Sequence, residues 1–224
     1  RLLPDVEGLD VAGELQLLQA GHVGLGLGEL LGQRLELPLQ DRRIGGGRLG
    51  AACTNKAAEG LKVESETEAL NADRLALTQM LFVEGNHVCP SCEKSGNCQL
   101  QAVAYHLGML TPHFTHFYPA RDVDASHPDV LLERNRCILC ELCVRASRDV
   151  DGKNVFGIGG RGIRARLIVN SASGRLADTN LSVTDRAAEV CPTGAIIRKR
   201  HGFTIPIGKR LYDHHDIAEV PVAG

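Results

Sequence analysis

The chain has 224 residues, eight cysteines and a formal net charge of −2 at pH 7. This length is enough for one or two domains with buried cores, and the lack of a basic excess disfavours a nucleic-acid-binding surface. No run of 18 apolar residues occurs, so the sequence predicts no membrane-spanning helix.

Residues 1–50 have an unusual composition. They contain 14 Leu and 11 Gly but no Cys, Ser, Thr, Asn, Lys, Met, Phe or Tyr. Nearly every residue belongs to a type that a codon beginning with C or G can encode. A GC-rich gene that is read in a shifted frame would produce this bias, because its G/C-rich third codon positions would become first positions. We therefore predict that residues 1–50 are a mistranslated stretch. The alternative is a genuine low-complexity segment.

The next segment is predicted to form a short strand and two helices. Polar and apolar residues alternate over 61–64, as in a strand. Residues 65–68 have the composition of a helix start, and apolar residues follow at helical spacing as far as Val83. The apolar face of this helix is expected to pack into the core; it comprises Leu70, Leu77 and Leu81. A second helix is predicted over 99–107.

A cysteine-rich loop lies between these two helices. His87, Cys89, Cys92 and Cys98 have the spacing H-x-C-x2-C-x5-C. Three thiols are one ligand short of the four that a [4Fe-4S] cluster needs, and imidazole is an accepted cluster ligand. We predict that His87 is the fourth ligand. His106 or a water molecule remains as the alternative.

A second group of thiols follows a connector. Cys137, Cys140 and Cys143 are spaced C-x2-C-x2-C, and Cys191 directly precedes Pro192. A [4Fe-4S] cluster is typically ligated by three closely spaced cysteines and a fourth, distant cysteine that precedes a proline. A zinc site typically uses two close pairs of ligands instead. The sequence therefore favours a second cluster, with a structural zinc protein as the alternative.

Short elements are expected around these thiols. Helices are predicted over 141–148 and 182–190, and a last strand starts at Ile196. The glycine-rich stretch 157–162 matches G-x-G-x-x-G, but a strand-like run follows it where a nucleotide-binding loop needs a helix. We therefore expect a hairpin turn there. The tail to residue 215 is interpreted as a docking extension.

Eight cysteines also allow disulfides. Six of them fall in two tight groups, however, and no secretory leader is recognisable. Reduced thiols in a cytosolic protein indicate metal or redox chemistry, so the expected location is the cytoplasm.

The motifs together resemble a known family. The stretches 84–103, 137–143 and 191–195 resemble the gamma (small diaphorase) subunit of soluble, bidirectional NAD-reducing nickel–iron hydrogenases. That subunit is similar to the N-terminal part of the large iron–sulfur subunit of respiratory NADH dehydrogenase. The resemblance implies an α+β fold, with a helical [4Fe-4S] segment ligated by one histidine and three cysteines, followed by a ferredoxin-like [4Fe-4S] domain.

The resemblance also implies an N-terminal [2Fe-2S] ferredoxin domain, which is absent or garbled here. Cys53 corresponds to its fourth ligand, but no cysteine precedes it, so residues 1–50 do not support a [2Fe-2S] cluster. The implied organisation is a suspect segment 1–50, a remnant of the [2Fe-2S] domain over 51–66, the histidine-plus-three-cysteine domain over 67–121 and the ferredoxin-like domain over 122–224.

By resemblance, the chain is expected to be an iron–sulfur electron-transfer subunit of an NAD-linked oxidoreductase. It would relay electrons between a flavin/NAD(H)-binding diaphorase subunit and hydrogenase subunits, which would hold the catalytic sites. The alternative is the equivalent segment of NADH dehydrogenase or of an NAD-dependent formate dehydrogenase.

Overall fold

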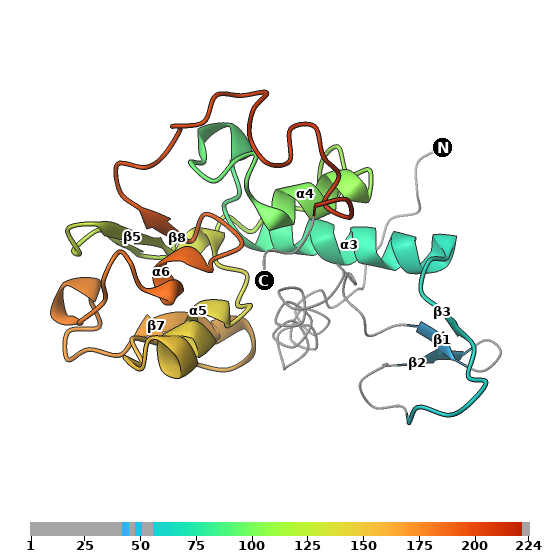
Figure 1. The fold of residues 1–224 in the computed structure, drawn as a ribbon, viewed down its shortest axis with the longest axis horizontal. Helices are drawn as coiled ribbons and strands as arrows, with labels where there is room; N and C mark the ends of the chain where they lie inside the picture. Colours follow the sequence, from blue (N-terminus) through green and yellow to red (C-terminus); the bar gives the residue numbers. More distant parts are fainter. Residues whose placement is uncertain (1–41, 45–47, 51–55, 221–224) are drawn as a thin grey trace.

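The structure, a computed structural model, describes residues 42–44, 48–50 and 56–220 (Figure 1). The remainder of the segment 1–50 and Cys53 lie outside the described residues. At the N-terminal end of the described part, β1 (Arg42–Ile44) lies between β2 (Arg48–Gly50) and β3 (Val63–Glu64) in an antiparallel sheet. The strand predicted over 61–64 is therefore present as β3.

Helix α3 (Glu68–Glu84) begins where the sequence predicts a helix start. The N-cap is Thr67, whose Oγ1 accepts a hydrogen bond of 3.3 Å from the amide of Leu70. This bond satisfies one of the amides that a helix N-terminus leaves without an intrahelical partner. Helix α4 (Gln99–His106) confirms the second predicted helix and packs against α3.

The buried face of α3 differs from the prediction. Leu70 is buried, but Leu77 and Leu81 are only half-buried, and the polar residues Arg74 and Thr78 are buried instead. Arg74 donates hydrogen bonds to Glu66 and Asn71 at 3.0 and 2.7 Å, and Thr78 donates to the carbonyl of Arg74 at 2.8 Å. Because these polar groups are paired, their burial is tolerated.

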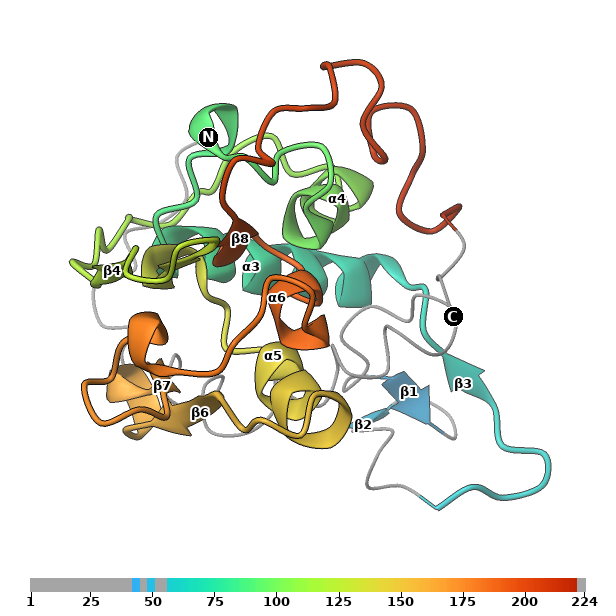
Figure 2. The same ribbon diagram turned by 60° about the vertical axis from the view of Figure 1, so that its left-hand side comes forward.

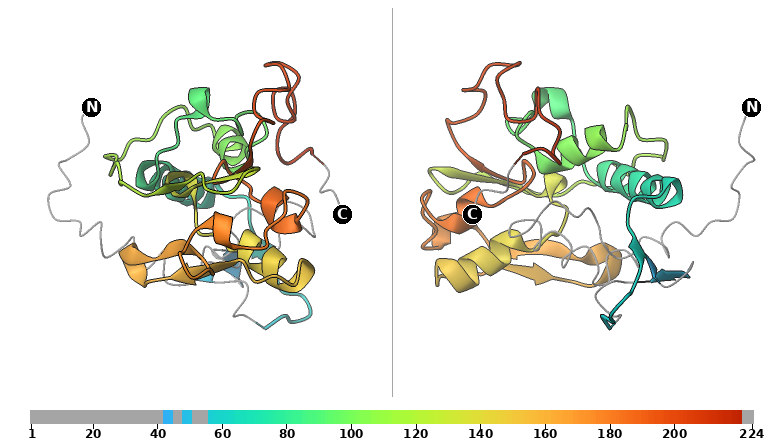
Figure 3. Two further views of the ribbon diagram at one scale, coloured as in Figure 1. Left: turned by 90° about the vertical axis from the view of Figure 1, so that its left-hand side faces the viewer. Right: turned by 45° about the vertical axis from the view of Figure 1, so that its right-hand side comes forward.

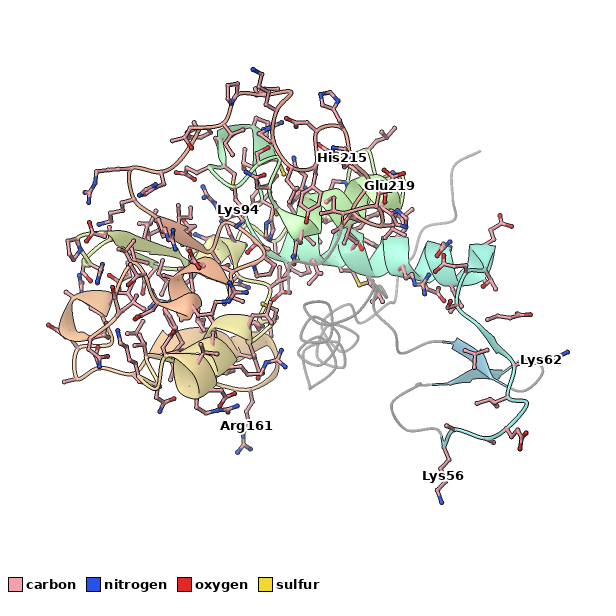
Figure 4. The ribbon with its side chains drawn as sticks, in the orientation of Figure 1. Lys56, Lys62, Lys94, Arg161, His215 and Glu219 are labelled. Atoms are coloured by element: carbon pink, nitrogen blue, oxygen red, sulfur yellow. The ribbon has the colours of Figure 1, made fainter. Side chains whose placement is uncertain are left out.

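The second half of the described chain is built from two small sheets and short helices. β5 (Val130–Glu133) lies between β4 (Val123–Asp124) and β8 (Ile196–Arg198), and all pairings are antiparallel. β6 (Phe156–Gly159) and β7 (Arg166–Val169) form a hairpin. Residues 157–159 of the glycine-rich stretch belong to β6, and residues 160–162 begin the hairpin connection, as predicted. The labelled Arg161 in this connection points away from the body (Figure 4).

Two short helices complete this part. α5 (Leu142–Arg145) continues into a π-helical turn over Ala146–Val150, and α6 (Arg186–Glu189) leads to the last strand. α6 is shorter than the predicted 182–190 because Asp185 accepts a hydrogen bond from the amide of Ser182 and forms a turn. The mixture of helices and sheets confirms an α+β fold.

The sheet β4–β5–β8 separates the two halves of the core. α4 lies on one side of it, and α5 with the β6–β7 hairpin lies on the other (Figures 2 and 3). One apolar cluster, centred on Phe156, Leu132 and Leu176, fills the β6–β7 side. A second cluster contains Phe82 and Leu100 from the α3–α4 side together with Ile138 and Leu142. This second cluster joins the two halves.

The C-terminal tail returns to the loop before α4 (Figure 1). The amide of Tyr212 donates to the carbonyl of Gly96 at 2.9 Å, and the amide of Leu211 donates to Asn97 Oδ1 at 3.0 Å. Ile217 is buried. The tail predicted to be a docking extension thus docks on its own chain. Among the described residues, no helix is both long and apolar enough to cross a membrane.

Candidate metal centres

The upstream group of predicted ligands lines one cavity. His87, Cys89, Cys92 and Cys98 all contribute to its wall, together with Phe82, Arg136 and Gly194 among others. The end of α3 delivers the chain into this loop, a short 3-10 turn (η1, Cys89–Ser91) holds the first thiol, and Cys98 is the N-cap of α4. Two helix ends therefore position the four side chains.

The environment of His87 suits a metal ligand. Its Nε2 is buried and makes no hydrogen bond, and within the described part of the chain only Arg198 Nε shares this property. A Cβ on Gly85 would lie 2.6 Å from this Nε2, so glycine leaves room for the ring. Burial, reinforced by the positive charges of Arg136 and Arg121, lowers the pKa of His87 to about 4. The imidazole is therefore neutral at pH 7, as metal ligation requires.

The alternative ligand lies elsewhere. Nδ1 of His106 is 2.8 Å from Asp216 Oδ1, in an ion pair near the tail, and His106 does not line the cavity. The structure therefore brings His87, and not His106, together with the three thiols.

The downstream group also lines one cavity. Cys137, Cys140, Cys143 and the distant Cys191 share it with apolar side chains that include Ile158 and Leu167. The loop of the triplet turns through two left-handed residues, Leu139 (φ 55°) and Glu141 (φ 61°), a conformation that non-glycine residues rarely adopt. α6 then returns Cys191 to the triplet.

The described thiols are unpaired; Cys98, Cys140 and Cys143 are buried, and the other four are half-buried. None of the seven cysteines among the described residues forms a disulfide. Burial raises the pKa of Cys98 and Cys140 to about 12 and that of Cys137 to about 11. Ionised thiolates are unfavourable here without a compensating positive charge, which bound iron would supply. The donor set and its burial fit iron–sulfur clusters.

Each group of thiols lines one cavity. In the described ranges, no three His, Cys, Asp or Glu side chains are arranged to hold a single metal ion. The spacing of the thiols in the sequence, three close and one distant, is that of a [4Fe-4S] cluster and differs from the two close pairs of a typical zinc site.

Two family models match the parts of the chain that contain these cavities. The model of the NADH-ubiquinone oxidoreductase-G iron–sulfur binding region matches residues 74–113, and the 4Fe-4S single cluster domain matches residues 130–197. The gamma subunit of the NAD-reducing hydrogenase HoxS of Cupriavidus necator is 42% identical over 168 residues, which cover 75% of this chain and 71% of that protein. This chain belongs to the family of NAD-reducing hydrogenase gamma subunits. It is an iron–sulfur electron-transfer subunit of an oxidoreductase.

A solved structure and a respiratory subunit are also similar to this chain. A crystal structure of an NAD+-reducing [NiFe]-hydrogenase in the H2-reduced state has a chain that is 53% identical, with a TM-score of 0.78 over 86% of this chain and 81% of that chain. The 78 kDa subunit of the mitochondrial NADH-ubiquinone oxidoreductase of Candida albicans is 30% identical over 160 residues, 70% of this chain but 21% of that protein. The family therefore shares its iron–sulfur part with much longer respiratory subunits.

Three further residues lie at these sites that the sequence analysis did not single out. A Cβ on Gly194 would lie 2.7 Å from Cys92 Sγ and 3.3 Å from the side chain of Arg136. Thr193 Oγ1 lies 3.7 Å from Cys191 Sγ and donates to the carbonyl of Arg136 at 2.8 Å. The motif Cys-Pro-Thr-Gly was visible in the sequence, but its contact with the upstream loop was not.

Proposed function

We propose that this chain relays electrons between a flavin/NAD(H)-binding diaphorase subunit and a hydrogenase module through two [4Fe-4S] clusters. The first would be held by His87, Cys89, Cys92 and Cys98, and the second by Cys137, Cys140, Cys143 and Cys191. The observation that carries the proposal is that each set of four lines its own cavity and that both cavities border the same apolar core. When bound, such clusters supply one-electron transfer.

The residues around the first cavity hold and insulate it. Phe82 packs against the His87 ring, with ring centroids 5.4 Å apart, and Cys98 is buried. Neutral His87 replaces one anionic thiolate, so this set carries one negative charge fewer than the second set. A less negative ligand set favours reduction.

A backbone hydrogen bond connects the segments that form the two cavities. The amide of Gln99, next to Cys98, donates to the carbonyl of Pro192, next to Cys191, at 2.9 Å. Cys98 and Cys140 belong to the same apolar core cluster. A short, dry and rigid connection between two one-electron carriers is what a relay needs, and the protein contributes distance, electrostatics and water exclusion.

The proposed organisation has a first cluster domain over 67–121 and a ferredoxin-like domain over 122–224, whose tail returns to the first. Residues 51–66 are proposed to be the remnant of a [2Fe-2S] domain, and 1–50 a mistranslated segment. A cytoplasmic location is proposed because reduced thiols persist there.

The alternatives are less well supported. An equivalent segment of NADH dehydrogenase is less similar in sequence, since the Candida albicans 78 kDa subunit is 30% identical over 160 residues. The hydrogenase gamma subunit of Cupriavidus necator is 42% identical over 168 residues, which favours the hydrogenase. A structural zinc protein is disfavoured by the sequence spacing of the thiols, because three close cysteines and a distant Cys-Pro differ from the two close pairs of a typical zinc site.

The test is the variant Cys140→Ala in the assembled complex. Loss of this thiol should remove the second cluster and abolish hydrogen-driven NAD reduction, while NADH-driven dye reduction at the flavin persists. Val150→Ala, an exposed change in the same helical segment, should leave both activities unchanged. Survival of hydrogen-driven NAD reduction in Cys140→Ala would refute the relay.

A further inference from the structure

Arg136 occupies a position between the two candidate sites. It directly precedes Cys137 in the chain, and its carbonyl accepts the hydrogen bond of Thr193 beside Cys191. Its side chain turns the other way and lines the cavity of His87 and the upstream thiols. The point where a Gly194 Cβ would stand is 3.3 Å from Arg136 Nη1 and 2.7 Å from Cys92 Sγ. The guanidinium therefore lies beside the first site only.

Glu93 neutralises this guanidinium. Its Oε2 is 2.9 Å from Arg136 Nη1, and the two side chains are only 30% and 18% exposed. Glu93 follows Cys92 directly in the chain, but it does not line the first cavity; its carboxylate acts on that site through the ion pair with Arg136, which does. The tail lies beside Glu93, because a Cβ on Gly202 would lie 2.7 Å from Glu93 Cγ. The ion pair is thus partly shielded from water, where charges interact more strongly than at the surface.

The two charges must act on reduction with opposite signs. Reduction of a cluster adds one electron, so a nearby positive charge stabilises the reduced state and a nearby negative charge destabilises it. Arg136 lines this cavity, so its positive charge lies next to a cluster held there. Arg121 does not line the cavity, and it is paired with Glu84 at 3.2 Å.

We propose that the Arg136–Glu93 ion pair sets the reduction potential of the cluster held by His87, Cys89, Cys92 and Cys98. The inference rests on the proposed function, since it presumes that cluster. Arg136 raises the potential, Glu93 lowers it, and their balance fixes how readily the first cluster accepts an electron relative to the second.

The test is a redox titration of the assembled complex, followed by electron paramagnetic resonance of each cluster. Arg136→Gln should lower the potential of the first cluster, Glu93→Gln should raise it, and the double variant should fall between them. Arg136→Lys, which keeps the charge, should stay nearer to the unsubstituted protein than Arg136→Gln. The second cluster should shift less, because Arg136 does not line its cavity.

Arg148→Gln is the control, because Arg148 is exposed and paired with Asp149 away from both cavities. Equal potentials in Arg136→Gln and Glu93→Gln, or shifts of the same sign, would overturn the inference. If Arg136→Gln does not retain the cluster, the Glu93→Gln result decides alone: an upward shift supports the inference and no shift overturns it. A missing first-cluster signal in the unsubstituted complex would instead refute the proposed function.

Discussion

His87 has an environment that a purely structural histidine would not need. Its buried Nε2 has no hydrogen-bond partner in the protein, and an unpaired buried polar atom costs about 1–3 kcal/mol. The neighbouring Gly85 and Phe82 shape the space for the ring. Ligation of iron would satisfy this atom, and it accounts for why the ring is kept in the cavity.

Replacing His87 by Ala should therefore remove the first cluster. The expected loss is about four iron ions per chain, measured by iron analysis of anaerobically purified protein. His106→Ala is the matched control, since His106 is paired with Asp216 outside the cavity, and it should retain its iron. Equal iron content in the two variants would show that His87 is not a ligand.

The residues of the sites were predictable from the sequence to different degrees. Cysteine spacing was enough to group seven thiols, because cluster ligation constrains the number of residues between ligands. Gly194 and Arg136 were not predictable, because their roles depend on a contact with Cys92, which is distant in the sequence. Such contacts follow from the packing of the two halves and leave no local pattern.

At the scale of elements, the carboxylate of Asp124 links β4 to the segment before α6 by hydrogen bonds. Its carboxylate accepts hydrogen bonds from Ser126 Oγ at 2.6 Å, from the Ser126 amide at 3.0 Å and from the Leu176 amide at 2.8 Å. Burial alone would raise the pKa of Asp124, but these bonds outweigh it and the pKa lies below its usual value.

Asp124→Asn should lower the free energy of unfolding by about 2 kcal/mol, the loss expected for hydrogen bonds to a charged group. Because the folded pKa is depressed, the contribution of the carboxylate is complete above its unfolded pKa of about 3.9 and is lost only below it. The difference from the unsubstituted protein should therefore stay constant from pH 5 to pH 8, measured by thermal unfolding. Asp73→Asn, at an exposed position, is the control; a difference that narrows by pH 5 would contradict the depressed pKa.

The elements themselves were largely predictable, and the differences have physical causes. Helical spacing located α3 and α4, and alternation located β3 and the β6–β7 hairpin. The predicted buried face of α3 was only partly right. Leu70 is buried and Leu81 packs against the second apolar cluster, but Arg74 and Thr78 are also buried with hydrogen-bond partners, which a hydrophobic pattern does not register. The tail was predicted to be a docking extension without a docking site, because its anchors on Gly96 and Asn97 are backbone and amide bonds without a sequence signature.

At the scale of the molecule, two thiol-lined cavities border a shared apolar core. Cys191 contributes to the second site. Gly194, three residues later in the chain, lies against Cys92 of the first site. The tail closes over the loop of the first site. The helices, the two C-terminal sheets and the tail are thus connected around two candidate cluster sites, as a relay subunit requires.

The most direct test of this account is the iron and acid-labile sulfide content of the anaerobically purified full-length chain, with Mössbauer spectroscopy to identify the cluster type. We predict about eight iron and eight sulfide ions per chain, since each [4Fe-4S] cluster contributes four of each. A content of four, or zinc in place of iron, would contradict the account.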